Sequence, residues 1–255
     1  MGRYVDIAGH STWIEEAGGG EQTIVLLHGG VSNGDSMLDA IGAPLAERYH
    51  LVAPDRRGHG RTADTDAPFH YAEMADETIG VLEDVVGGPA HLVGWSDGGI
   101  VALLVSLRRP DLVARQVLIG TNYHFDGVRP LDMDPENPLG QAMYTAYVER
   151  SPDGADHFPV VMSKAVALFD SEPTLTTDDV RQVASPSLVL VGDDDAIELG
   201  HTAALFEALP AGQLAVVPRT SHFVPIEAPA EVARLVLEFL AVAVPPATML
   251  PSRRR

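Results

Sequence analysis

The sequence predicts a doubly wound α/β fold, in which a mostly parallel sheet of about eight strands is flanked by helices. Three observations carry this prediction. Apolar runs rich in Val, Ile and Leu recur along the chain, segments with helical periodicity lie between them, and a chain of 255 residues that is 45% hydrophobic can form one large core. We therefore expect one fold and one site.

Six of the apolar runs are the predicted parallel strands, and they lie at residues 23–29, 49–55, 89–96, 114–120, 187–193 and 212–218. Their apolar residues are continuous rather than alternating, which is typical of strands buried on both faces by helices. Two further segments, at residues 3–9 and 11–18, are separated by His10. They predict an antiparallel hairpin at the edge of the sheet.

Residues 71–87 form the clearest helical pattern. Their apolar side chains recur at spacings of three and four, which makes one stripe along a helix: Tyr71, Met74, Ala75, Thr78, Ile79, Leu82, Val85 and Val86. The same spacing predicts a helix near the end of the chain, through Val232, Leu235, Val236, Phe239 and Leu240. Helices that alternate with apolar strands in this way favour a sheet covered on both faces.

Residues 123–184 interrupt this alternation, since they offer short helical patterns broken by Pro and Gly but no strand. Because a long insertion of this kind is usually functional, we interpret it as a helical cap over the strand ends. The predicted core then comprises residues 1–122 and 185–244. Residues 245–255, which contain three prolines and an arginine cluster, are predicted to be a mobile tail.

The charge balance excludes several classes of partner. The formal net charge is −19 and Lys164 is the one lysine, so the chain lacks the cationic surface that attracts nucleic acid or anionic lipid. The absence of cysteine excludes disulfides and thiolate chemistry. A charged N-terminus and the lack of an apolar run of roughly 20 residues predict a cytoplasmic protein without a membrane span. We expect a small-molecule substrate, and the sequence leaves the oligomeric state open.

The stretch Gly94-Trp95-Ser96-Asp97-Gly98 satisfies the pattern G-x-S-x-G. It follows a predicted strand and precedes a helical segment, which is the context in which this motif has physical meaning. A sharp strand-to-helix turn forces the serine into strained dihedral angles, and the glycines remove side chains that would clash with neighbouring elements. The hydroxyl of Ser96 is thereby exposed, close to the unpaired amides of a helix N-terminus that can stabilise an oxyanion.

A serine hydroxyl needs a base within hydrogen-bond reach, and the base needs an acid that orients it. Asp193, Asp194 and Asp195 lie at and just beyond the carboxyl end of one predicted strand, and His222 lies in the loop after the next strand. Parallel sheets build their sites at the carboxyl ends of strands. These residues are therefore the candidate acid and base for Ser96.

From about residue 3 to residue 243 the chain resembles the α/β-hydrolase superfamily. The matching pieces are HGG at 28–30, DRRGHGRT at 55–62, GWSDGG at 94–99, GDDD at 192–195 and SHF at 221–223, with the nucleophile, acid and base in the family's order. The segment GWSDGG, the nucleophile elbow, is similar to that of valacyclovir-hydrolase-like (biphenyl-hydrolase-like) enzymes. The resemblance implies an α/β-hydrolase fold with a short helical cap. It also implies the triad Ser96, Asp195 and His222, because the family's acid follows the strand-end glycine as G-x-x-D.

The resemblance implies an oxyanion hole made by the backbone amides of Asp97 and Gly30, with Val31 as the fallback for Gly30. Gly30 is expected to adopt dihedral angles that other residues cannot, which would point its amide into the site. His28 and His59 belong to glycine-rich turns and are interpreted as residues that hold loops together. The contiguous acids lack the spacing of a calcium loop and no histidine pair has metal-ligand spacing, so neither a metal nor a cofactor is expected.

A serine at the nucleophile position excludes the dehalogenases and epoxide hydrolases of this fold, which attack with an aspartate. The expected reaction is cleavage of a carboxylic ester, or of a related thioester, lactone or amide, through an acyl-serine intermediate. Val31, Trp95 and Asp97 are the expected substrate contacts. Two alternatives stay open on the same fold: a cofactor-free carbon–carbon hydrolase or lyase, and a ligand-binding pseudo-enzyme.

The carboxylate of Asp97 has two interpretations. A carboxylate beside a closed pocket is costly unless it is paired with a positive charge. It can pair inside the protein with Arg56, Arg57 or His59. It can instead receive the amino group of a cationic substrate, as the resemblance to valacyclovir-hydrolase-like enzymes implies.

Overall fold

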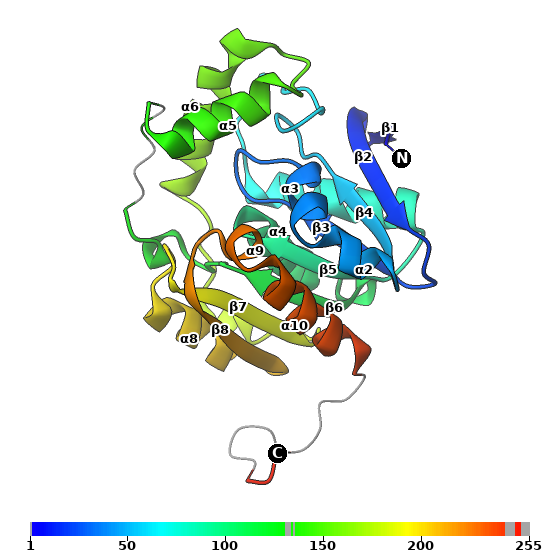
Figure 1. The fold of residues 1–255 in the computed structure, drawn as a ribbon, viewed down its shortest axis with the longest axis vertical. Coiled ribbons are helices and arrows are strands. Elements are labelled where there is room, and N and C mark those ends of the chain that lie inside the picture. The colour runs from blue at the N-terminus through cyan, green and yellow to red at the C-terminus, as the bar shows by residue number, and fades with distance from the viewer. Residues whose placement is uncertain (1, 131–133, 135, 243–247, 251–255) are drawn as a thin grey trace.

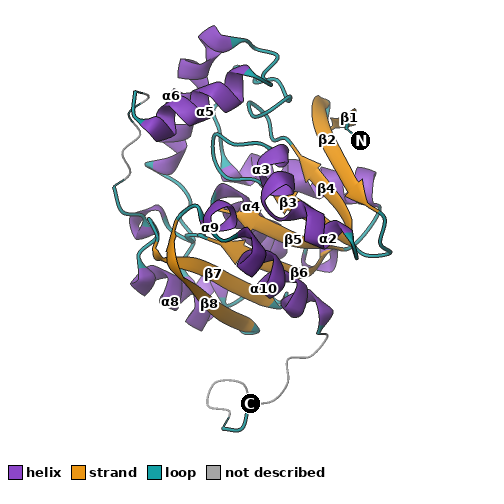
Figure 2. Cartoon of the chain, viewed as in Figure 1, coloured by secondary structure: helices purple, strands orange, loops and turns teal. Residues whose placement is uncertain are grey.

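The computed structural model describes residues 2–130, 134, 136–242 and 248–250, and its centre is one eight-stranded sheet (Figures 1 and 2). In space the strands follow the order β1-β2-β4-β3-β5-β6-β7-β8. In chain order they are β1 (Arg3–Ile7), β2 (His10–Gly18), β3 (Thr23–Leu27), β4 (His50–Pro54), β5 (Ala90–Trp95), β6 (Val113–Ile119), β7 (Ser187–Asp194) and β8 (Gly212–Ser221). The α/β-hydrolase fold expected from the sequence is confirmed.

The strands from β3 to β8 pair in parallel, whereas β2 pairs antiparallel with both β4 and β1. The predicted hairpin is therefore at the edge of the sheet. His10 is the first residue of β2 and pairs with Ile7, so the expectation that His10 separates the two strands was wrong. The turn consists of Ala8 and Gly9, whose φ angles of 53° and 85° are those that a tight two-residue hairpin turn requires.

The continuous apolar strands supply both faces of the sheet. Ile24 and Leu26 of β3 belong to one buried cluster, and Val25 and Leu27 belong to the other. Helices α3 (Tyr71–Gly80), α4 (Asp97–Arg108) and α8 (Leu199–Ala208) pack on the second face, and α1 (Gly34–Met37), α2 (Ala43–Ala46) and α10 (Pro229–Ala241) pack on the first. The alternation of side chains along a strand thus explains why consecutive residues of a central strand such as β3 are apolar.

The long helix predicted at residues 71–87 consists of two parts. Helix α3 ends at Gly80 and continues as a wider, π-helical stretch over Val81–Val86. Gly87, at a φ of 79°, ends it in the left-handed conformation that commonly follows a helix. The predicted C-terminal helix is α10.

Between β6 and β7 the chain forms α5 (Pro138–Val148), α6 (Phe158–Phe169) and the short α7 (Thr177–Val180). The described residues of this segment contain no strand beyond isolated bridges between His124 and Thr174 and between Val128 and Ile197. Figure 1 shows α5 and α6 side by side at one end of the molecule, beyond the sheet. We call residues 123–184 the helical segment. The tail predicted at residues 245–255 lies outside the described residues except for 248–250.

Carboxylates tie the helical segment to the rest of the chain. We call these contacts the anchors, and they are Lys164–Asp64 at 2.7 Å, His157–Asp64 at 2.8 Å, Arg150–Asp35 at 2.9 Å and His70–Glu172 at 2.7 Å. Each anchor joins a residue of the helical segment to a residue from the first half of the chain. Every helix in the described part of the chain is too short or too polar to cross a membrane.

Candidate active site

Ser96 occupies the turn between β5 and α4, with φ 54° and ψ −118°. This is a strained conformation for a residue with a side chain, as expected from the sequence. The flanking glycines are required by close contacts: a Cβ at Gly94 would lie 2.2 Å from the carbonyl oxygen of Gly98, and one at Gly98 would lie 2.1 Å from that of Leu27. The motif therefore allows the strand, the turn and the helix to approach one another with only the serine side chain projecting.

His222 and Asp195 come to Ser96 from two neighbouring strand ends. The Nε2 atom of His222 lies 2.9 Å from the Oγ of Ser96, and its Nδ1 lies 2.8 Å from the Oδ1 of Asp195. Asp195 is buried and accepts further hydrogen bonds from the amides of Ile197 and Gly192, at 2.9 Å and 3.3 Å. Because an ionised carboxylate can only accept, the Nδ1 of His222 carries the proton and Nε2 is left to accept from the serine hydroxyl.

The other two acids of the GDDD stretch have no described hydrogen bond to the histidine. Asp193 and Asp194 end β7 and are exposed. The carboxylate of Asp193 accepts hydrogen bonds from the amides of Arg219 and Thr220, at 2.7 Å and 3.3 Å. Of the three acids, Asp195 alone has a described contact with His222.

Gly30 and Asp97 lie together beside the nucleophile. Both line a cavity of about 590 Å³ that Ser96 and His222 also line. A Cβ at Gly30 would lie 2.7 Å from the Oδ2 of Asp97. A residue with a side chain at this position could therefore not approach the nucleophile elbow as closely as Gly30 does. The two backbone amides predicted as oxyanion donors thus belong to segments that meet at the serine.

The conformation expected of Gly30 was wrong. Its φ lies outside the left-handed region, and the residue that occupies this region is Val31, with φ 51°. Gly30 is needed for space rather than for its dihedral angles. Val31 is buried and lines a separate small cavity with His59 and Tyr147, so it is not among the residues that line the large pocket, where it was expected to contact substrate.

Asp97 is 4% exposed, and its carboxylate accepts a hydrogen bond from the hydroxyl of Tyr71, at 2.9 Å. Burial raises its pKa above the usual value, while the positive charge of Arg56 and the hydrogen bond from Tyr71 act in the opposite direction. Arg56 does not contact the carboxylate directly: its guanidinium donates to the carbonyl oxygens of His28 and Gly29, at 2.6 Å and 3.0 Å. The internal partner of Asp97 is therefore a phenol, with Arg56 as the nearby cation.

The other proposed partners of Asp97 are engaged elsewhere. Arg57 forms an ion pair with Glu73 at 2.6 Å. His59 contacts the carbonyl oxygen of Arg57 at 2.9 Å, and burial lowers its pKa to about 3. His28 accepts a hydrogen bond from the amide of Arg56 at 3.2 Å, and burial lowers its pKa well below the usual value. Both histidines are thus neutral and hold neighbouring loops together.

The sequence-based reasoning missed Tyr71, which it assigned only to an apolar helical stripe. A signal was present, because a tyrosine on a buried stripe needs a partner for its hydroxyl. It also missed Glu172, whose carboxylate accepts from the amide of Tyr71 at 3.0 Å and lines the large pocket. Glu172 lies in a loop of the helical segment, where no periodic pattern points to it.

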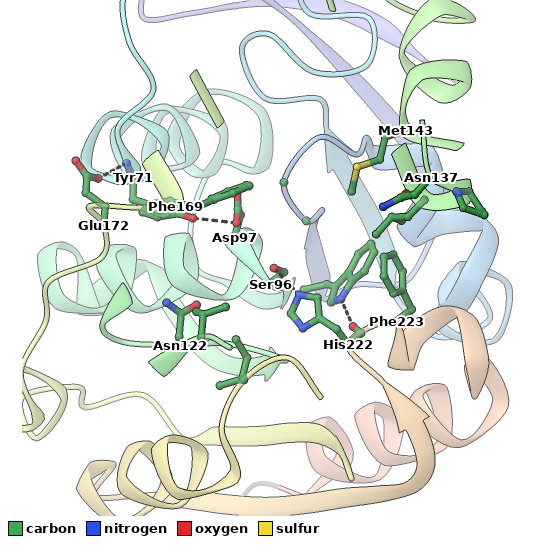
Figure 3. A pocket seen from close by; sticks show the side chains of 17 residues that line it. Tyr71, Ser96, Asp97, Asn122, Asn137, Met143, Phe169, Glu172, His222 and Phe223 are labelled. Atoms are coloured by element: carbon green, nitrogen blue, oxygen red, sulfur yellow. Dashed lines mark hydrogen bonds between the residues drawn. The ribbon is translucent and has the colours of Figure 1, made fainter. Parts of the chain in front are cut away.

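The pocket is largely apolar and has distinct sides (Figure 3). Tyr71, Asp97, Phe169 and Glu172 lie on one side of Ser96, and Asn137, Met143, His222 and Phe223 lie on the other. Val128, Leu139 and Ile197 complete the apolar lining. The described residues that line this pocket include neither lysine nor arginine.

Trp95, an expected substrate contact, lines the pocket and has a second contact. Its indole Nε1 donates a hydrogen bond to the backbone oxygen of His222, at 2.8 Å. The tryptophan before the nucleophile is therefore bonded to the backbone of the histidine. Within the part of the chain that the structure describes, no group of three or more His, Asp and Glu side chains is placed to hold a metal ion.

The chain belongs to the α/β-hydrolase family, whose model matches residues 24–235. Among individual proteins, it is 25% identical to Serine hydrolase BPHL of Mus musculus, over 89% of this chain and 81% of that protein. It is also 25% identical to 2-hydroxymuconate semialdehyde hydrolase of Pseudomonas putida, over 95% of both chains. A solved structure of a serine hydrolase involved in carbazole degradation has the same fold, with a TM-score of 0.79, 23% identity and coverage of 94% of this chain and 98% of that one.

Proposed function

We propose that the chain is a serine hydrolase that cleaves a small-molecule carboxylic ester, or a related thioester, lactone or amide, through an acyl-serine intermediate. The observation that carries this proposal is the continuous hydrogen-bonded series from the Oγ of Ser96 through His222 to Asp195. Ser96 and His222 line an apolar pocket of about 590 Å³, a size typical of small-molecule sites.

In the first half of the reaction, the Oγ of Ser96 attacks the substrate carbonyl carbon while Nε2 of His222 takes its proton. Asp195 holds the ring orientation and stabilises the imidazolium that forms. The amides of Gly30 and Asp97 donate to the oxyanion of the tetrahedral intermediate. The intermediate then collapses: the bond to the leaving group breaks, His222 returns the proton to the leaving atom, and the acyl group stays on Ser96.

In the second half, a water molecule replaces the leaving group. His222 takes a proton from this water as it attacks the acyl carbon, and the same two amides stabilise the second tetrahedral intermediate. Collapse breaks the bond to the Oγ of Ser96, and His222 returns the proton to that atom. The products are a carboxylic acid and the free enzyme.

The charge of the pocket favours substrates without an anionic group. Asp97 and Glu172 line it, and its described lining contains no lysine or arginine to pair with a carboxylate. An anionic substrate would lose its hydration there without gaining a cation in return. A neutral ester has no such cost.

A carbon–carbon hydrolase is the second candidate, and similarity favours it. 2-Hydroxymuconate semialdehyde hydrolase and 2-hydroxy-6-oxo-6-(2'-aminophenyl)hexa-2,4-dienoic acid hydrolase match 95% and 94% of this chain. The names of both relatives describe substrates that are carboxylic acids. The lack of a cation in the described pocket lining is the observation that ranks this candidate second.

A fluorophosphonate probe tests the central proposal. We expect it to label the wild-type chain and to leave Ser96→Ala unlabelled, because the probe reacts with an activated serine. Labelling that is absent, or that persists in Ser96→Ala, would reject an active serine at this position. Absent labelling would support a pseudo-enzyme, whereas persistent labelling would place the reactive nucleophile at another residue.

A substrate panel separates the two candidate reactions. It compares uncharged p-nitrophenyl esters and lactones with a 2-hydroxy-6-oxo-dienoate, followed by absorbance. We expect kcat/KM for the best uncharged ester to exceed that for the dienoate. The reverse order, lost in Ser96→Ala, would establish carbon–carbon cleavage instead.

The role of the Asp97 side chain needs a separate comparison. Its burial and its hydrogen bond from Tyr71 support an internal role. An amino-acid ester and its des-amino analogue are compared in the wild type and in Asp97→Asn. For an internal role, the ratio of their kcat/KM values is the same in both proteins; a preference for the amino ester that Asp97→Asn abolishes would assign the carboxylate to a cationic substrate.

We also propose that the helical segment is a cap over this pocket. It supplies Asn137, Leu139, Met143, Phe169 and Glu172 to the lining. Phe169 and Glu172 lie on one side of Ser96, and Asn137 and Met143 lie on the other (Figure 3). Their substitution is expected to alter the choice of substrate more than the rate of the chemical step.

A further inference from the structure

The histidine of the triad lies in a turn that must be held in place by other residues. His222 follows β8 and precedes α9 (Val224–Glu227), and its ring has to meet a serine that is carried by a different strand. Asp195 fixes the orientation of the ring through Nδ1. The position of the ring also depends on the backbone of the turn, which Asp195 does not contact through any described hydrogen bond.

Trp95 contacts this backbone directly. Its Nε1 donates to the carbonyl oxygen of His222 at 2.8 Å, and its ring packs edge-on against Phe223 with centroids 5.4 Å apart. Trp95 is 5% exposed and immediately precedes Ser96. A rigid side chain adjacent to the nucleophile is therefore bonded to the main chain of the base.

Glu227 holds the turn from the other side. Its carboxylate accepts from the amide of Ser221 at 2.6 Å and from the hydroxyl of Ser221 at 2.9 Å. The Oγ of Ser221 in turn accepts from the amide of Phe223 at 3.3 Å. The residues on both sides of His222 are thus joined to one carboxylate, and hydrogen bonds to a charged acceptor are the stronger kind.

We propose that Trp95 and Glu227 are positioning residues of the hydrolase, which hold the turn of His222 so that Nε2 stays within hydrogen-bond reach of Ser96. This inference rests on the proposed serine-hydrolase function. A shift of about 1 Å at reacting atoms can cost about 100-fold in rate. Residues that fix the base therefore act on the chemical step rather than on substrate affinity.

The two tryptophans of the chain provide a matched pair of variants. Trp95→Phe retains an aromatic ring and removes the indole donor to His222. Trp13→Phe removes a buried indole N–H that has no hydrogen-bond partner in the described part of the chain and that lies outside the site. We expect Trp95→Phe to lower kcat about tenfold with KM within about threefold, and Trp13→Phe to leave both within about twofold.

Glu227 provides a test that does not alter the pocket, because this residue is not among the pocket's lining residues. Glu227→Gln keeps one oxygen acceptor and Glu227→Ala keeps none. We expect kcat to fall about threefold in the first and about tenfold in the second, with KM retained in both. A graded loss of kcat at constant KM is not expected of a residue that only stabilises the fold.

Each variant is assayed with the uncharged ester, and its active sites are counted with the fluorophosphonate probe. Unchanged kcat per active site in both Trp95→Phe and Glu227→Ala would overturn the proposal, as would a loss explained entirely by fewer active sites. If Trp95→Phe does not fold, the Glu227 series decides alone. Failure of the serine-hydrolase proposal is distinguishable, because the wild type itself would then show no Ser96-dependent labelling.

Discussion

Gly30→Ala is the substitution that most directly tests the proposed oxyanion hole. The added Cβ would lie 2.7 Å from both the Oδ2 of Asp97 and the Cζ of Phe169, whereas ordinary contacts begin near 3.4 Å. The added Cβ and each of these two atoms must therefore move apart by 3.4 − 2.7 = 0.7 Å. The tip of the Phe169 ring can turn aside, but the Asp97 carboxylate is buried and bonded to Tyr71. The turn of Gly30 has to retreat instead.

This retreat sets the size of the expected effect. A donor that starts near 2.9 Å from an oxyanion and moves away by about 0.7 Å is no longer within hydrogen-bond distance. Removal of one oxyanion donor typically lowers kcat by about 100- to 1,000-fold, which corresponds to about 2.7 to 4 kcal/mol. We expect a loss of this size in kcat/KM for Gly30→Ala, carried mostly by kcat.

The assay is steady-state hydrolysis of a p-nitrophenyl ester, with active sites counted by fluorophosphonate labelling. Gly19→Ala is the control, because a Cβ at Gly19 meets nothing within 4 Å. We expect the control to match the wild type. If Gly30→Ala retained kcat/KM within about threefold of the control, the amide of Gly30 would not be an oxyanion donor.

Three further predictions concern the acid, an anchor and the buried elbow carboxylate. Asp195→Asn is expected to lower kcat about 10,000-fold at an unchanged melting temperature, and a loss below about tenfold would reject Asp195 as the acid. Asp64→Asn removes the negative charge that the amine of Lys164 contacts at 2.7 Å. Labelling of this one lysine by an amine-reactive reagent, measured from peptide masses, is therefore expected to be severalfold faster than in the wild type. An unchanged labelling rate would contradict the Lys164–Asp64 anchor. Burial raises the pKa of Asp97, so the folded state keeps this proton to higher pH than the unfolded state does, and the stability that this group contributes falls as pH rises above about 4. The free energy of unfolding of Asp97→Asn minus that of the wild type, both measured by urea titration, should therefore increase with pH. A difference that does not change with pH would refute the raised pKa of Asp97.

Much of the fold could be predicted because burial leaves a direct record in the sequence. Continuous apolar runs identified the parallel strands, since both faces of each strand pack against helices. Ser96, His222 and the three acids at 193–195 could be brought together from chain order and topology, because parallel strands end at one edge of the sheet. The choice of Asp195 among these acids came from the resemblance to the α/β-hydrolase superfamily. The strained turn at Ser96 followed from the spacing of its glycines.

The contacts that could not be predicted involve backbone atoms or conformations that have no residue signature. The bond from Trp95 to the carbonyl oxygen of His222 joins residues 127 positions apart, and every residue carries such a carbonyl. The left-handed conformation falls on Val31 although Gly30 is the residue best suited to it. The hydroxyl of Tyr71 reaches Asp97 only because α3 packs beside α4, and sequence spacing within one helix does not give that distance.

The anchors of the helical segment differ in how salt would act on them. Lys164 and Asp64 are 15% and 1% exposed in their side chains, whereas Arg150 and Asp35 are 23% and 20% exposed. Dissolved ions screen exposed charge pairs far more than buried ones. Rising ionic strength is therefore expected to weaken the Arg150–Asp35 anchor before the Lys164–Asp64 anchor, so that α6 stays fixed to Asp64 when the end of α5 does not stay fixed to Asp35.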